Sequence, residues 1–187
     1  RSGVFSPQSR LSEHDSRRAD VERGQGALRD DCGLSEADRV VITVSRLVKK
    51  NGVDTLIEAM RFLPENVKLL IAGTGPELDK YQLLVTRYQL LGRVHFLGHL
   101  DHAELPHYLA LADVFCRPSR SEGLGSVFLE AMALGVPVVA TPVGGIPDFL
   151  QHELTGLFAE VDNPESVAAQ IRRLLEDRAL RERIVVN

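Results

Sequence analysis

The sequence is poor in several features that define particular classes of protein. It contains only two cysteines, Cys32 and Cys116, and no tryptophan among its 187 residues. Cys116 lies in the apolar run Asp-Val-Phe-Cys, so we expect two reduced thiols, one of them buried, rather than a disulfide. No apolar run approaches the roughly 20 residues that a bilayer-spanning helix needs, and the first residues lack the pattern of a secretory signal. The sequence therefore predicts a cytoplasmic protein.

An excess of positive charge is also missing. The formal net charge is -4, and lysine and arginine are spread along the chain rather than clustered. A nucleic-acid-binding domain needs a concentrated basic surface, so DNA and RNA are not expected as partners. The apolar content of 44% and the charged content of 26% are those of an ordinary globular domain.

Two regions differ in texture. Residues 1–38 have mixed charge and no regular apolar period, which indicates an irregular lead-in or interdomain linker, with a short strand near Gly3–Phe5 and a helical turn around Ala27–Asp31 as its only expected elements. Residues 39–187 are expected to form the folded domain. Because the chain begins with Arg1 rather than Met, and ends at Asn187 without a change in composition, we expect both ends to be cuts in a longer protein.

From Arg39 onward, short β-branched runs alternate with helical patterns, as in buried parallel strands joined by crossover helices. The predicted strands are Val40–Val44, Lys68–Ala72, Val94–Phe96, Asp113–Cys116, Val136–Ala140 and Gly156–Phe158. The predicted helices are Gly52–Arg61, Pro76–Leu90, Ala103–Leu111, Ser126–Leu134, Ile146–Gln151 and Pro164–Glu176. Asp54 and Asn163 are expected N-caps, and Pro76 and Pro164 are expected in first turns.

This alternation predicts the α/β class, with a Rossmann-like doubly wound sheet of about six parallel strands and helices on both faces. In such sheets ligands bind outside the carboxyl ends of the strands. Functional residues are therefore expected directly after the strands, at 45–46, 73–75, 97–99, 117–125 and 141–145.

The run from Pro118 to Asp148 carries the strongest chemical signal. Gly123 and Gly125 directly precede a predicted helix, where a ligand anion can approach bare backbone amides, although a tight turn needing glycine only for its geometry explains them as well. Glu122 and Glu130 bracket this turn, and two carboxylates at that spacing can each accept hydroxyl hydrogen bonds from one extended ligand. Glu130 has apolar neighbours, so we expect it partly buried and in need of a partner.

The same run, Pro-Ser-x-x-Glu-Gly-x-Gly followed by Glu-Ala-Met-Ala-x-Gly-x-Pro-Val-Val-Ala, is similar to the two-glutamate signature of glycosyltransferase family 4. That family has two Rossmann-like domains, the GT-B fold, and retains the anomeric configuration of the transferred sugar. The resemblance extends in order from about Val40 to Glu176 and includes SRLVKKNGVDTLIEAM, LLIAGTGPELD, VHFLGHL and ADVFCRPS. A pattern of this length is far more specific than a lone glycine motif.

The resemblance implies roles for individual residues. It implies two catalytic residues, Glu122, which faces the transferred sugar, and Arg46, which is a cation on the diphosphate, while Glu130 binds the ribose hydroxyls. The other substrate-binding residues that it implies are Lys50, Gly73, Gly75, Leu97, His99, Leu100, Gly123, Leu124, Gly125, Ser126, Gly144 and Gly145. Among them, the residues from Leu97 to Leu100 border the nucleobase, residues 123–125 present amides to the sugar or diphosphate, and Gly144 and Gly145 line the sugar pocket or form a plain turn.

The implied activity is retaining transfer of a hexose from a nucleoside diphosphate sugar, with UDP or GDP expected, in carbohydrate biosynthesis. Negative charge develops on the leaving diphosphate, and cations together with backbone amides at a helix start stabilise it. No Asp-x-Asp pair lies near the site, so we expect neither a metal nor a cofactor. We expect the acceptor domain to lie outside this chain and the fragment to be inactive by itself. Peripheral contact with the cytosolic face of a membrane is expected through that missing half.

The pattern departs from the family at three positions. Asn51 stands where the family usually has lysine, directly before the glycine that opens the first helix, although Lys49 and Lys50 lie next to it. Ser45 replaces a frequent glycine, and Asp148 a frequent glutamate. If neither lysine reaches the phosphates, one cation is missing, which keeps open the alternative of a non-catalytic domain that binds a nucleotide sugar.

Other readings fit less well. His95, His99, His102 and His107 invite a zinc site, but no complementary Cys or Asp arrangement completes a tetrahedral set. A dinucleotide-dependent dehydrogenase would need a Gly-x-Gly-x-x-Gly turn after the first strand. A related nucleotide-sugar isomerase would lack the two-glutamate run.

Overall fold

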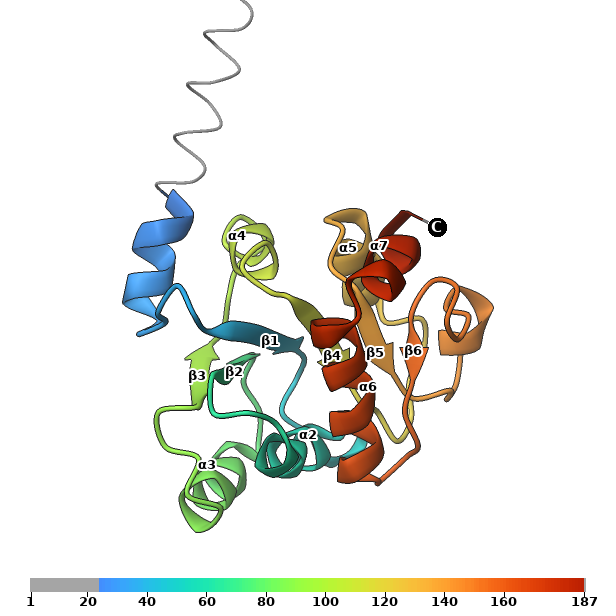
Figure 1. The fold of residues 1–187 in the computed structure, drawn as a ribbon. Helices are drawn as coiled ribbons and strands as arrows, with labels where there is room; N and C mark the ends of the chain where they lie inside the picture. The colour runs from blue at the N-terminus through green and yellow to red at the C-terminus, as the bar shows by residue number, and fades with distance from the viewer. Residues whose placement is uncertain (1–23, 187) are drawn as a thin grey trace, which may run out of the picture. The chain divides into compact units, whose positions relative to one another are not determined.

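A computed structural model describes residues 24–186 (Figure 1). Residue contacts divide the chain into two compact units, Arg1–Glu36 and Ala37–Asn187. The described part of the first unit forms a helix over residues 24–31, which confirms and extends the turn expected at Ala27–Asp31. The strand expected near Gly3–Phe5 lies outside the described residues.

The second unit is built on one sheet of six parallel strands, in the order β3-β2-β1-β4-β5-β6. The strands are β1 (Arg39–Val44), β2 (Val67–Ala72), β3 (Val94–Gly98), β4 (Val114–Arg117), β5 (Val138–Ala140) and β6 (Leu157–Phe158). Their order reverses between β1 and β4, where Val41 pairs with Leu69 on one side and Val114 on the other. The doubly wound α/β class is confirmed, and the β1–β4 boundary is the switch point where such folds bind ligands.

Helices cover both faces of this sheet (Figure 1). The α-helices are α2 (Val53–Ala59), α3 (Leu78–Arg87), α4 (Leu105–Leu109), α5 (Ser126–Ala133), α6 (Pro164–Glu176) and α7 (Arg178–Val186), and the 3-10 turns are η1 (Lys49–Asn51), η2 (Met60–Phe62) and η3 (Ile146–Asp148). Helices α2, α3 and α6 lie on one face of the sheet, and α4 and α5 lie on the other. Within residues 24–186, none of the helices has both the length and the apolar character to cross a bilayer.

Several local expectations are wrong, each for a backbone reason. The segment Ile146–Gln151 forms only η3, because the Gln151 amide donates to the Thr155 hydroxyl at 2.8 Å instead of continuing a helical ladder. Pro76 precedes α3 rather than opening it, since the Glu77 amide donates to the Leu47 carbonyl at 3.1 Å. Strand β5 begins only after Pro137, which lacks the amide proton that a central strand needs.

One of the two predicted N-caps is confirmed and the other is wrong. Asn163 is the N-cap of α6 as expected, its side chain accepting from the Ser166 amide, and Pro164 occupies the first turn. Asp54 is not a cap, because Gly52 holds that position in α2 and the Asp54 carboxylate pairs with Arg120.

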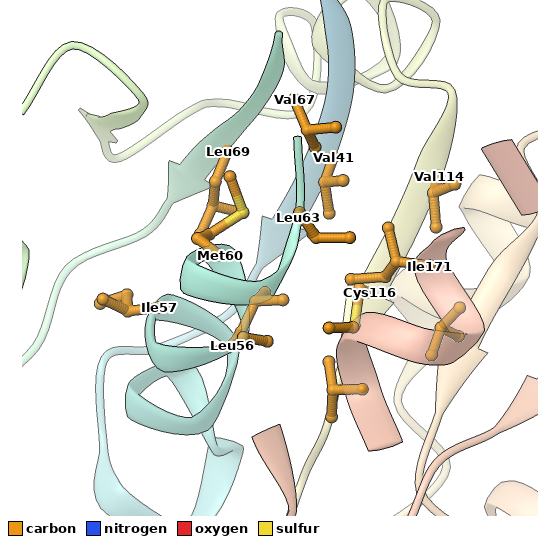
Figure 2. Packing of buried hydrophobic residues seen from close by; sticks show 14 of the residues in the cluster. Val41, Leu56, Ile57, Met60, Leu63, Val67, Leu69, Val114, Cys116 and Ile171 are labelled. Atoms are coloured by element: carbon orange, nitrogen blue, oxygen red, sulfur yellow. The ribbon is translucent and has the colours of Figure 1, made fainter. Parts of the chain in front are cut away.

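The core between the sheet and the α2, α3 and α6 layer is apolar and closely packed (Figure 2). Val41, Leu69 and Cys116 from the strands meet Leu56 of α2 and Ile171 of α6 there, all fully buried. Both cysteines are free, and burial raises the pKa of the Cys116 thiol far above its usual range. A neutral thiol in this position packs as a small apolar side chain.

Candidate functional site

Two cavities open at the carboxyl edge of the sheet. The first, here the glycine-loop cavity, has a volume of about 460 Å³ and is lined by Val44, Ser45, Arg46, Ala72, Gly73, Thr74, Gly75, His99 and Leu100. The second, the lysine-loop cavity, has a volume of about 590 Å³ and is lined by Arg46, Val48, Lys49, Lys50, Asn51, Arg117 and Glu122. Arg46 lines both cavities.

The glycine-loop cavity has walls of closely apposed backbone. Gly73 has a φ of +131°, and a Cβ there would lie 1.9 Å from the Ser45 carbonyl oxygen. The Leu47 amide donates to the Thr74 carbonyl at 2.9 Å, which continues the pairing of β1 with β2 beyond both strands. The contact between these loops therefore requires glycine at position 73 whether or not a ligand approaches.

The lysine-loop cavity gathers positive charge from the segment after β1. The side chains of Arg46, Lys49 and Lys50 are exposed. Within residues 24–186, none of these three cations has an acidic partner at ion-pair distance. Unpaired cations that converge on one concave surface favour an anionic ligand.

Asn51 holds this segment in shape. The residue is only 4% exposed, and its Nδ2 donates to the Arg46 carbonyl at 2.7 Å. This bond closes the loop between Arg46 and Asn51, so that Lys49 and Lys50 both line the cavity. The residue that replaces the family lysine is thus a clasp between backbone segments, with two lysines beside it.

Glu122 forms the opposite wall of the lysine-loop cavity. Its carboxylate pairs with the Arg117 guanidinium and accepts from the Ser119 hydroxyl at 3.2 Å and from the Gly123 amide at 3.1 Å. Both charged side chains are nearly buried, with 8% of Glu122 and 9% of Arg117 exposed. Such a set of partners fixes the orientation of the carboxylate.

Arg117 is itself held from three further directions. It donates to the Val44 carbonyl at 3.2 Å and to the Ser119 hydroxyl at 3.3 Å, and its guanidinium lies 5.0 Å from the centre of the Phe128 ring. Burial lowers the pKa of Arg117 to about 10, so the group remains charged at neutral pH. The pair therefore presents a carboxylate with its charge already balanced.

The segment after Glu122 leads into α5. Gly125 is the N-cap of α5 with a φ of +62°, and no side chain caps the first amides of this helix. Gly123, Leu124 and Ser126 are exposed, and a Cβ on Gly123 would meet nothing within 4 Å. The exposed start of a helix is suited to an anion or a polar ligand group.

The loop after β5 packs against the loop that carries Glu122. Gly144 has a φ of +56°, and a Cβ there would lie 1.8 Å from the Glu122 carbonyl oxygen. The Gly145 amide donates to the Gly123 carbonyl at 3.2 Å. These two glycines therefore pack against the backbone of the loop that carries Glu122, and they line neither cavity.

The two cavities are lined by some of the residues singled out in the sequence. Arg46, Lys50 and Glu122 line the lysine-loop cavity, and Gly73, Gly75, His99 and Leu100 line the glycine-loop cavity together with Arg46. The other predicted site residues line neither cavity: Leu97, Gly123, Leu124, Gly125, Ser126, the half-buried Glu130, Gly144 and Gly145. Among residues 24–186, no three His, Cys, Asp or Glu side chains gather as a metal-binding group.

Sequence reasoning missed two arginines of this region. Arg117 pairs with Glu122, and Arg120 bridges the loop after β4 to the start of α2 through Asp54. Both positions flank or fill the variable places of the Pro-Ser-x-x-Glu pattern, so no motif marked them. The available signal was their charge, since an arginine at the end of a buried strand requires an acidic partner nearby.

Known proteins resemble this chain over most of its length. A GDP-mannose-dependent phosphatidylinositol monomannoside mannosyltransferase of Mycobacterium tuberculosis is 41% identical over 148 residues, which are 74% of this chain and 38% of that protein. The structure of Anabaena HepE in complex with UDP and glucose is 30% identical, with a TM-score of 0.82, over 88% of this chain and 46% of that one.

The length of the match identifies which part of such proteins this chain resembles. The C-terminal domain of a group 1 family glycosyltransferase from Francisella tularensis is 26% identical with a TM-score of 0.73, and the match covers 80% of this chain and 81% of that domain. The chain spans less than half the length of the two longer relatives. Residues 25–187 match the family model described as glycosyl transferases group 1. The chain therefore belongs to the group 1 glycosyltransferases and has the fold of a GT-B C-terminal domain.

Proposed function

We propose that this chain is the donor-binding domain of a retaining glycosyltransferase of family 4. The enzyme transfers a sugar from a UDP-sugar or a GDP-sugar to an acceptor held by another domain. The observation that carries the proposal is the lysine-loop cavity. Three cations without an acidic partner among residues 24–186, Arg46, Lys49 and Lys50, line this cavity together with Glu122, whose carboxylate is fixed by a buried ion pair. A negatively charged diphosphate joined to a sugar rich in hydroxyls matches both walls.

We place the donor across both cavities. The nucleobase occupies the glycine-loop cavity beside His99 and Leu100, and the diphosphate passes Arg46, which the two cavities share. The sugar then reaches Glu122 and the exposed start of α5. Glu130, on the next turns of α5, is assigned to the ribose hydroxyls. The bound UDP of HepE and the GDP-mannose of the mycobacterial relative support a donor of this chemical class.

The proposed chemistry follows from the charges at the site. As the bond between the anomeric carbon and the diphosphate breaks, negative charge accumulates on phosphate oxygens. Arg46, Lys49 and Lys50 stabilise this charge. We assign this task to cations and helix-end amides rather than to a metal ion. The acceptor enters on the face that the diphosphate leaves, with a diphosphate oxygen as base, so that configuration is retained.

A thermal-shift panel tests donor binding. UDP, GDP, ADP and their sugars are added to the chain, and a nucleotide that binds the folded state should raise Tm by mass action. We expect a shift with UDP or GDP and its loss in Glu130→Ala. Glu65→Ala, which removes an exposed carboxylate before the start of β2, the end of that strand opposite to Gly73, is the matched control and should keep the shift. A chain whose Tm responds to none of these nucleotides would contradict the proposal.

The alternative of a non-catalytic binding domain rested on the missing lysine at position 51. Because Lys49 and Lys50 both line the cavity, the positive charge of the site does not depend on that position. We therefore favour a catalytic role for the complete protein, acting in the cytoplasm or at the cytosolic face of a membrane. Measured sugar transfer by the full-length protein separates the two.

A further inference from the structure

Arg120 makes an unusually complete set of contacts beside the lysine-loop cavity without lining it. An arginine side chain has five N–H donors in a planar fork. In Arg120, Nε donates to Asp162 at 2.5 Å, and the two terminal nitrogens donate to the two Asp54 oxygens at 2.9 and 3.1 Å. The remaining two bonds reach the Lys49 carbonyl at 2.5 Å and the Thr55 hydroxyl at 3.2 Å. Every donor of the guanidinium is therefore used.

The main chain of Arg120 holds the same turn from a second direction. Its amide donates to the Lys50 carbonyl at 2.7 Å. Thus the carbonyl groups of both Lys49 and Lys50 end on Arg120, one on the side chain and one on the backbone. Because each carbonyl is fixed, the peptide planes of the turn are fixed, and so are the directions in which the two lysine side chains leave it.

Arg120 also links this turn to the opposite wall of the cavity. It lies two residues before Glu122 in the loop after β4, while Asp54 and Thr55 lie in the first turn of α2. Its own charge is balanced by the carboxylates of Asp54 and Asp162. The contribution of Arg120 to the cavity is therefore geometric, and it sets how far the two lysines stand from the carboxylate.

We infer that Arg120 is a positioning residue for the diphosphate of the donor, acting through Lys49 and Lys50. This inference rests on the proposed donor site. A planar fork is required because lysine, with three donors and no fixed plane, cannot serve Asp54, Asp162, Thr55 and the Lys49 carbonyl together.

The test compares two ligands by calorimetry, well below Tm. One is UDP or GDP, whichever wild type binds more tightly, and the other is the matching nucleoside, which lacks the diphosphate. In Arg120→Lys, affinity for the nucleoside diphosphate should fall by about ten-fold, which is the value of one hydrogen bond to a charged group, whereas nucleoside affinity should not change. An equal loss for both ligands, or no loss for either, would overturn the inference.

A double-mutant cycle shows whether Arg120 acts through the lysines. Lys50→Ala alone should weaken nucleoside diphosphate binding by at least a few-fold, as the loss of one phosphate contact requires. In a chain that already carries Lys49→Ala and Lys50→Ala, Arg120→Lys should have almost no further effect. A full ten-fold loss in that background would mean that Arg120 acts by another route.

Two further outcomes are distinguishable. If Arg120→Lys does not fold, Asp162→Asn takes its place, since Asp162 is exposed and accepts one of the five bonds. It should then give a smaller loss confined to the diphosphate ligand, and an unchanged affinity would overturn the inference. If wild type binds no nucleoside diphosphate, the proposed function fails first. If wild type binds and every variant binds equally well, only the role of Arg120 fails.

Discussion

At the scale of single residues, the site is defined by which charges are paired and which are not. Glu122 is balanced by Arg117, and Arg120 by Asp54 and Asp162, whereas the cations of the lysine loop have no acidic partner in the described part of the chain. Pairing gives a side chain a fixed orientation, and the lack of it leaves charge available for a ligand. The charged residues that fix the loops are therefore different from the charged residues that are proposed to bind the ligand.

The buried pair of Arg117 and Glu122 gives a prediction of stability. Arg117→Met leaves the Glu122 carboxylate buried without its partner, which should lower the free energy of unfolding by about 3–5 kcal/mol at pH 7. Adding Glu122→Gln to that variant removes the uncompensated charge and should restore part of the loss. Urea denaturation of the single and double variants measures both, and a double variant less stable than Arg117→Met would contradict the explanation.

At the scale of elements, the site is made by loops that touch through their backbones. The loops after β1 and β2 meet at Gly73, and those after β4 and β5 meet at Gly144. No side chain fits between them, so the position of each loop is determined by its neighbour. The sheet thus fixes the cavity walls, although the walls themselves belong to no strand.

Gly144 and Gly123, which lie in the two touching loops after β5 and β4, should differ when they are substituted. Gly144→Ala places a Cβ against the Glu122 carbonyl at a positive φ, so it should displace the loop and lower Tm by several degrees. Gly123→Ala meets nothing within 4 Å and should leave Tm nearly unchanged, while its methyl group should weaken donor binding by occupying the exposed backbone face beside Glu122. Thermal unfolding with and without UDP or GDP checks both, and equal Tm losses would refute the distinction.

The sequence was sufficient for the succession of strands and helices, because β-branched runs separated by helical patterns leave strong local signals. It also indicated the edge where the cavities lie, because ligands of doubly wound sheets bind outside the carboxyl ends of the strands. It was not sufficient for the pairing of charges. Arg117 and Glu122 are separated by a turn whose course depends on Gly144, twenty-two residues further along the chain from Glu122. Arg120 meets Asp54 across 66 positions, a separation that no periodic pattern records. Likewise, the role of Asn51 as a clasp became clear only from its bond to the Arg46 carbonyl.

At the scale of the whole molecule, the two cavities lie at the carboxyl edge of a single sheet and are open in the described part of the chain. A site that excludes water and holds an acceptor would need a second wall, which the proposed function assigns to another domain. The relatives continue for more than this chain's own length, as the 38% and 46% coverage of two of them shows.

We therefore expect the purified chain to bind a donor without transferring its sugar. Incubation with labelled UDP- or GDP-sugars and a panel of acceptors should give no transfer above background, whereas the full-length protein should give turnover. Rapid sugar transfer by the chain alone would contradict the expectation that transfer needs a second domain. Hydrolysis of the donor by the chain would instead indicate that water can replace the acceptor.

Arg46 lines both the glycine-loop cavity and the lysine-loop cavity, so inhibitors of either cavity would share this residue. A compound that fills only one hollow can engage this guanidinium and turn it away from the other. Two small fragments, each chosen for one hollow, would then compete for a single charge even though their surfaces never touch. A molecule that spans both would meet no such conflict, because one anionic bridge satisfies the arginine for its two ends together.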